Sequence, residues 1–120
     1  MNNLQEAIIW AEKNLIGKSF KHPEISKSIH FTRQGVRHAL RAKTSDLKIE
    51  FIYQLPNILK KAVLIDETTD RKGRPDIKVI YKLFVNYKSG GKKYFVYITA
   101  REGVNGVVYY DNVLLKQKQH

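Results

Sequence analysis

The chain has 120 residues, 42 % of them hydrophobic, and no cysteine, so it fits one domain with a modest core and excludes disulfides and thiolate metal sites. Its apolar runs are too short to cross a bilayer and its first residues do not resemble a secretory signal, which predicts a single cytoplasmic domain over residues 1–120. Lys and Arg total 22 against 11 Asp and Glu, and the net charge of +11 favours a polyanionic partner, with nucleic acid ahead of an anionic membrane.

The first 31 residues predict one helix and one short strand. Apolar residues from Asn3 to Asn14 follow helical spacing, and Gly17 fits the end of that helix. The segment from Lys18 to Pro23 is predicted to be a connector with strand character at most. Three apolar residues after it indicate a short strand that leads into a helix: Ile25, Ile29 and Phe31.

Two further helices are predicted before residue 62. One covers Arg33 to Lys43 with Thr32 as its N-cap, because a threonine hydroxyl can accept from a free amide of the first turn. Gly35 inside it costs about 1 kcal/mol relative to alanine. The other begins at Asp46 and runs to about residue 54, and a proline at position 56 can open a further helical turn.

Two alternating runs between residues 77 and 102 predict a β-hairpin. A two-residue turn at Gly90-Gly91 makes the numbers of each facing pair sum to 181. Tyr87 then faces Tyr94 and Val85 faces Val96, so turn and apolar pattern agree on the register. The opposite face is basic and includes aromatic and hydroxyl side chains.

The remaining segments complete the predicted fold. Ala62 to Ile65 and Val107 to Tyr110 indicate one strand on each side of the hairpin. Helices followed by strands predict an α+β domain, with N-terminal helices packed on one face of a small antiparallel sheet of three to five strands. The helical part would cover about residues 1–62 and the sheet part about residues 62–115.

The residue types favour phosphate chemistry without a metal. His22, His30 and His38 are eight apart, which does not match the spacing of helical metal-ligand pairs, and the acidic residues are scattered. RNA cleavage by attack of the 2′-OH on the adjacent phosphorus needs a base, an acid and cations around the phosphate. A chain of charge +11 without metal motifs suits that reaction, and we expect no metal and no cofactor.

His38 is the main acid or base candidate, because imidazole titrates near neutrality and arginines around it favour phosphate. An ordinary exposed histidine on a basic helix is the alternative. Arg33, Arg37 and Arg41 lie four apart along one flank of the same helix and are candidate contacts to nucleic acid. His30 is the second candidate, although its place near a strand-to-helix junction favours a structural role.

The basic face of the hairpin supplies further candidates. Arg101 could hold a scissile phosphate through its planar guanidinium, and Thr99 could donate to a phosphate oxygen. Lys82 and Lys93 could bind nucleic acid, or could belong to an ordinary solvated strand face. Three aromatic residues could stack on bases, or could be covered by the last strand or a loop: Phe84, Phe95 and Tyr97.

Four segments within residues 29 to 115 resemble a known group of domains. They are IHFTRQGVRHALRAK, FIYQLPNILKKAVLID, IYKLFVNYKSGGKKYFVYITARE and VVYYDN. Their order resembles the nuclease-type domains of polyvalent proteins in phages and conjugative elements, grouped with the barnase, EndoU, colicin and RelE-like (BECR) fold. The resemblance implies a metal-independent endoribonuclease, often a toxin or an effector in genetic conflict. By motif position it implies His38, Thr99 and Arg101 as catalytic residues, with Arg37 or Arg41 assisting.

The sequence therefore predicts a toxin- or effector-type endoribonuclease that cleaves RNA by 2′-OH attack. An acidic immunity protein or antitoxin is the expected protein partner, and no membrane is involved. Two alternatives stay open. One is a non-catalytic nucleic-acid-binding module that uses the same basic face. The other is an interaction domain whose basic face is covered by an acidic partner.

Overall fold

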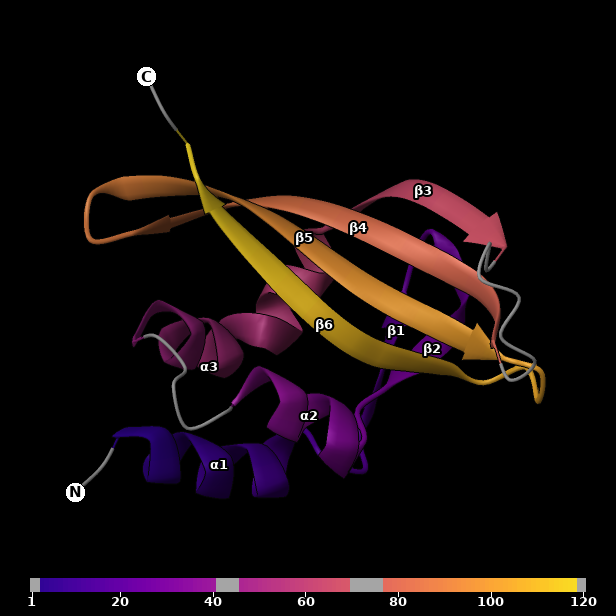
Figure 1. The fold of residues 1–120 in the computed structure, drawn as a ribbon, viewed down its shortest axis with the longest axis horizontal. Helices are drawn as coiled ribbons and strands as arrows, with labels where there is room; N and C mark the ends of the chain where they lie inside the picture. The colour runs from indigo at the N-terminus through magenta and orange to yellow at the C-terminus, as the bar shows by residue number, and fades with distance from the viewer. Residues whose placement is uncertain (1–2, 41–45, 70–76, 119–120) are drawn as a thin grey trace.

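The computed structural model describes residues 3–40, 46–69 and 77–118, which form three helices and six strands (Figure 1). The elements in chain order are α1 (Asn3–Asn14), β1 (Ser19–His22), β2 (Ile25–His30), α2 (Arg33–Ala39), α3 (Asp46–Lys61), β3 (Val63–Thr69), β4 (Ile77–Ser89), β5 (Lys92–Gly103) and β6 (Val108–Gln117). No helix among the described residues is long and apolar enough to cross a membrane.

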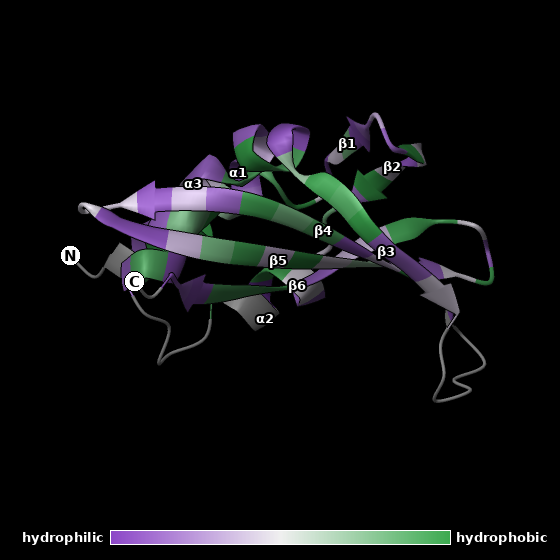
Figure 2. Ribbon diagram, turned by 90° about the horizontal axis from the view of Figure 1, so that it is seen from above, coloured by the Kyte–Doolittle hydropathy of each residue, from purple (hydrophilic) through white to green (hydrophobic). Residues whose placement is uncertain are grey.

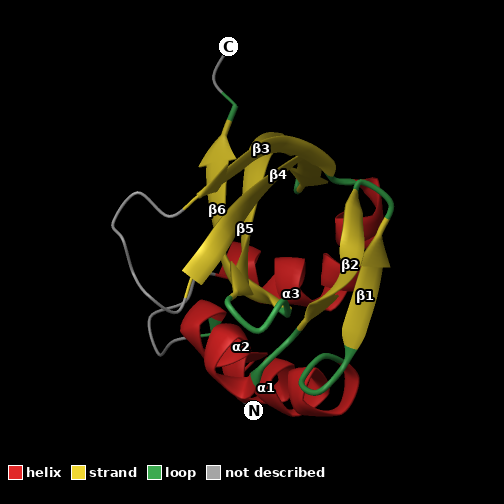
Figure 3. Cartoon of the chain, turned by 90° about the vertical axis from the view of Figure 1, so that its right-hand side faces the viewer, coloured by secondary structure: helices red, strands yellow, loops and turns green. Residues whose placement is uncertain are grey.

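All six strands belong to one sheet, in the order β1-β2-β6-β5-β4-β3. Strands β3 to β6 form an antiparallel meander, and β1 and β2 form an antiparallel pair. The two parts are joined by a parallel pairing of β2 with β6, in which Ile29 faces Val108 and His30 faces Tyr109. The sheet curls into a half-barrel, and the three helices lie together on its concave side (Figure 3).

The prediction of an α+β domain with helices on a sheet of three to five strands is wrong. About half of the described residues are in strands, and the sheet has six of them. The short strand expected around Ile25 and Ile29 is present as β2, but β1 was expected to be a connector with strand character at most, because it is short and polar. An inward position of β1 is occupied by His22, which is 1 % exposed and has its Nε2 2.6 Å from the carbonyl oxygen of Ala62. A buried histidine in place of an apolar residue hides the alternation that identifies a strand.

The predicted hairpin is confirmed. Facing residues sum to 181 from the Ser89–Lys92 pair to the Val79–Glu102 pair, and the register shifts only beyond that point. Gly90 and Gly91 have φ angles of 56° and 77°, the left-handed conformation that a two-residue hairpin turn requires. Figure 2 shows β4 and β5 hydrophobic in their middle and hydrophilic toward this shared turn.

The core lies between the concave face of the sheet and the helices. Leu83, Val96 and Ile98 of the hairpin are at most 1 % exposed. Helix α3 is continuous, with Pro56 inside it, rather than divided before Pro56 as the sequence suggests. A proline inside a helix costs about 3 kcal/mol. The buried side chains that flank it, among them Leu55, each contribute about 1.5–3 kcal/mol and together outweigh this cost.

A buried carboxylate ties β2 to β4 and β5 on the concave side. Glu102 is 4 % exposed and accepts a hydrogen bond from the Tyr81 hydroxyl at 2.9 Å. Its Oε2 lies 3.3 Å from the Nζ of Lys27 and 4.0 Å from that of Lys78. Burial acts to raise the pKa of Glu102, but the hydrogen bonds from Tyr81 and Lys27 and the two lysine charges outweigh it and lower the pKa. Burial and this carboxylate raise the pKa of Tyr81 to about 12.

The lowered pKa of Glu102 predicts that the folded protein loses stability in acid. Because the pKa of Glu102 is lower in the folded than in the unfolded chain, its contribution is complete above its ordinary value of 4.5 and is lost as pH falls through the folded-state pKa. In urea denaturation between pH 7 and pH 3, the free energy of unfolding of the parent should therefore fall below about pH 4.5. The free energy of unfolding of Glu102→Gln should fall less steeply over the same range. Equal slopes for the two proteins would contradict this role.

Candidate functional site

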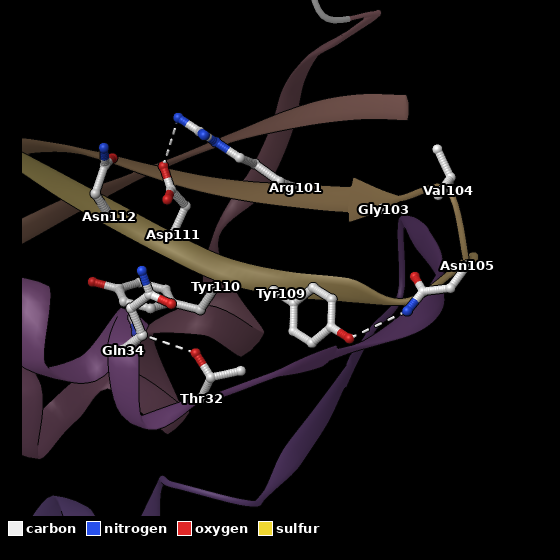
Figure 4. Close-up of a pocket in the computed structure, with 11 residues that line it drawn as sticks. Thr32, Gln34, Arg101, Gly103, Val104, Asn105, Tyr109, Tyr110, Asp111 and Asn112 are labelled. Atoms are coloured by element: carbon white, nitrogen blue, oxygen red, sulfur yellow. Dashed lines mark hydrogen bonds and ion pairs between the residues drawn. The ribbon is translucent and has the colours of Figure 1, made fainter. Parts of the chain in front are cut away.

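A pocket of about 740 Å³ lies where the start of α2 meets β6 and the turn between β5 and β6 (Figure 4). Its lining combines a guanidinium, a carboxylate, amides, a hydroxyl and aromatic rings, and includes Thr32, Gln34, Arg101, Tyr109, Asp111 and Asn112. A mixed lining of this kind suits a polar ligand with an aromatic part. No group of three or more His, Asp or Glu that could hold a metal ion occurs in the described ranges.

Helix α2 borders the pocket because a glycine lets it approach the backbone of β6. Strand β2 pairs with β6 only as far as Tyr109, and α2 packs beside β6 with Gly35 against Tyr110. A Cβ built on Gly35 would lie 2.7 Å from the carbonyl oxygen of Tyr110, so only glycine fits without a shift. The N-cap predicted at Thr32 is confirmed, since its Oγ1 accepts from the Gly35 amide at 3.1 Å.

A β-bulge brings an acidic residue to Arg101. Thr99 faces Asn112 and Ala100 faces Tyr110, so Asp111 is the extra residue on β6. Its Oδ2 lies 3.0 Å from a terminal nitrogen of Arg101, and the two side chains are 29 % and 31 % exposed. The pair holds the guanidinium in place at the pocket while leaving part of it accessible to a ligand.

Two buried polar atoms at this site have no hydrogen-bond partner in the described structure, the Nε of Arg101 and the hydroxyl of Tyr110. Burial raises the pKa of Tyr110, as does the nearby charge of Asp111 to a smaller extent, so the phenol stays protonated and is a donor. Buried polar groups are usually satisfied, and a catalytic role or a bound partner is among the explanations for one that is not. This observation favours the pocket over the rest of the surface.

His30, Tyr109 and Arg101 lie side by side across three strands. His30 of β2 faces Tyr109 of β6, and Tyr109 faces Arg101 of β5. The ring centroids of His30 and Tyr109 are 6.3 Å apart, and His30 is exposed. All three point to the convex face, the side of the sheet away from the helices, because their strand neighbours Ile29 and Val108 are buried in the core. Two strand spacings separate His30 from Arg101 by about 10 Å.

The structure distributes the residues singled out in the sequence over several places. Thr99 lies on the same face as Arg101 but is buried at 9 % exposure, opposite Lys82 and Asn112. Lys93 and Tyr97 lie farther along that face. His38 belongs to α2, but its side chain lies outside the described structure, as does Arg41. The prediction that this helix reaches Lys43 is wrong, because α2 ends at Ala39 with Leu40 as its C-cap.

The two remaining arginines of α2 are in surface positions. The Nη1 of Arg33 donates to the Oε1 of Glu12 in α1 at 2.9 Å, so part of its charge is already compensated. Arg37 is exposed. Whether these arginines contact nucleic acid stays a prediction.

Sequence reasoning missed Tyr109 and Asp111 and ranked His30 second. The pairing that brings His30 to Tyr109 involves only two residues on each strand, which are separated by most of the chain. Asp111 reaches Arg101 only because of a bulge whose position has no sequence signal here. The available hint was the motif VVYYDN, which places Tyr109 in a predicted strand and Asp111 directly after it.

Comparison with known proteins identifies the family of this domain. No curated protein and no solved structure matches the chain. One family model matches residues 1–110, and its description is Large polyvalent protein-associated domain 3. This match includes all three helices, five complete strands and the start of β6. The protein therefore belongs to the Large polyvalent protein-associated domain 3 family.

Proposed function

We propose that this domain is a metal-independent endoribonuclease that cleaves RNA through attack of a 2′-OH on the adjacent phosphorus. The observation that supports the proposal is the row of His30, Tyr109 and Arg101, of which Tyr109 and Arg101 also line the pocket. An imidazole, a phenol and a guanidinium supply proton transfer and anion binding, which are the functions that this reaction requires.

Each residue of the row has a distinct role in the proposed reaction. Arg101 binds the non-bridging oxygens of the scissile phosphate, and its charge offsets the charge that develops on the phosphorane. Asp111 is a positioning residue, because it holds the guanidinium at 3.0 Å. His30 is exposed and moves a proton between solvent and a reacting oxygen. Tyr109 lies between them and orients the phosphate or the adjoining sugar.

The biological setting is part of the proposal. Membership of a polyvalent protein-associated family is consistent with a toxin- or effector-type nuclease related to the BECR group, acting in the cytoplasm where RNA is present. The net charge of +11 favours both RNA and an acidic immunity or antitoxin protein that would cover the same face. His38 and Thr99 stay in the proposal as further participants.

Removing the arginine tests the phosphate site. Arg101→Ala should lower the rate of RNA cleavage about 10²- to 10³-fold, because an oriented donor to the developing anion is lost. Arg101→Lys should recover only a small part of the lost cleavage rate, since lysine keeps the charge but not the planar pair of donors. Cleavage of a fluorescently labelled RNA under single-turnover conditions measures both effects.

The matched control is Lys13→Ala, which removes an exposed cation from α1 on the helical side of the molecule. It should cut like the parent. If Arg101→Ala also cuts like the parent, the site is assigned to the wrong place. If neither the parent nor any variant cleaves RNA, but salt-sensitive RNA binding persists, the domain is a nucleic-acid-binding module instead.

A further inference from the structure

Three aromatic rings gather on the convex face, at some distance from the pocket. Phe84 of β4 faces Tyr97 of β5, and their ring centroids are 5.4 Å apart. Phe84 and Phe95 are 5.7 Å apart. All three side chains are partly exposed. We call Phe84, Phe95 and Tyr97 the aromatic platform.

The three rings of the aromatic platform are not part of the protein core. The alternate residues of the same strands, Leu83, Val96 and Ile98, are at most 1 % exposed and already fill the concave side. Apolar side chains extend the platform onto the flanking strands, since Val63 faces Phe84 and Leu114 faces Tyr97, at 49 % and 50 % exposure. A contiguous exposed apolar patch on a soluble domain marks an interaction surface.

Lysines surround the platform. Lys118 has its Nζ 5.6 Å from the centre of the Phe95 ring, and Lys116 faces Phe95 across the β5–β6 pair. Exposed lysines also lie toward both ends of the hairpin: Lys82, Lys88 and Lys93. Stacking rings bordered by cations match the alternation of bases and phosphates in a single-stranded nucleic acid. A duplex would not fit, because its bases are stacked inside and cannot lie on the rings.

The platform and the proposed phosphate site lie on one strand. Tyr97 and Arg101 both project from the convex face of β5 and are four residues apart, which is about 13 Å. A single strand stacked on the platform and extended along β5 by a few nucleotides would reach Arg101. We propose that the aromatic platform binds a single-stranded segment of RNA beside the cleavage site, an inference that rests on the proposed function for its choice of RNA over DNA.

The test measures binding without cleavage. A fluorescent 2′-O-methyl single-stranded oligonucleotide lacks the attacking hydroxyl, so its affinity is independent of nuclease activity. Phe95→Ala and Tyr97→Ala should each weaken its binding roughly 5- to 150-fold, the effect of losing one stacked base. Lys93→Gln and Lys116→Gln change exposed residues without risk to the fold, and each should reduce the slope of log affinity against log salt by about 0.7.

The matched control is Ile9→Ala, which removes an exposed apolar side chain from α1, 54 % exposed and on the opposite side of the sheet. Its affinity should equal that of the parent. Equal affinity for a duplex of the same sequence, or no loss in the aromatic and lysine variants, would overturn the inference. So would light scattering that shows a parent dimer abolished by Phe95→Ala, since the platform would then bind a second copy. Binding that persists in a parent without nuclease activity would support the platform and refute only the proposed function.

Discussion

Replacing His30 with alanine is expected to lower RNA cleavage by about 10²- to 10⁴-fold, the usual contribution of a positioned acid or base. His30 is the described histidine that lies beside Tyr109 and close to Arg101, on an exposed face where an RNA strand can reach it. Because its side chain packs against nothing in the core, the variant should fold like the parent. Single-turnover cleavage of a labelled RNA by the parent and by the variant gives the size of the loss.

His38→Ala is the informative comparison for this experiment. His38 lies about one turn beyond Gly35 in α2, the helix that borders the pocket. If His38→Ala loses activity while His30→Ala keeps it, the imidazole comes from α2 and the role assigned to His30 is wrong. If both variants lose activity, the two histidines act as acid and base.

Gly35→Ala is expected to destabilise the protein by roughly 1–2 kcal/mol. In an isolated helix alanine would be favoured by about 1 kcal/mol. Here the new Cβ would lie 2.7 Å from a backbone oxygen of Tyr110, which cannot rotate away, so α2 would have to move off β6. Overpacking costs about 1–3 kcal/mol, and a clash with a backbone atom falls in the upper part of that range, so the cost exceeds the gain in helix propensity by roughly 1–2 kcal/mol. Urea denaturation followed by circular dichroism measures the change.

Gln34→Ala is the control for the glycine variant, because it introduces the same alanine at the exposed neighbouring position and changes helix propensity only slightly. It should be neutral or slightly stabilising. A Gly35→Ala protein as stable as Gln34→Ala would show that the contact between α2 and β6 is loose, and would weaken the account of how the pocket is built.

The parts of the fold that the sequence predicted are those with a local physical signal. The β4–β5 register followed from Gly90 and Gly91, which allow the left-handed turn, and from an apolar face that is continuous only in one pairing. Helix α1 and the start of α2 followed from periodicity and from the hydroxyl of Thr32. In each case neighbouring residues determine the conformation.

The remainder depends on contacts between distant residues. Strand β2 joins the sheet through Ile29 and His30 alone, and its partner residues are nearly eighty positions away. Strand β6 continues to Gln117, well past the predicted end at Tyr110, because β5 supplies a partner along its full length. The candidate site was therefore the hardest part to predict. His30 approaches Arg101 only through the β2–β6 pairing, Tyr109 faces Arg101 through the β5–β6 pairing, and Asp111 reaches Arg101 only through the bulge in β6.

The central claim is that this domain cleaves RNA without a metal, and the most direct measurement is the chemistry of the cut ends. RNA labelled at its 5′ end is incubated with the protein in EDTA, and the products are identified by mass. Attack by the 2′-OH predicts fragments with 2′,3′-cyclic phosphate and 5′-hydroxyl ends, and no cut at a single 2′-deoxy position. No cleavage in EDTA, or cleavage that leaves 5′-phosphate ends, would contradict the claim.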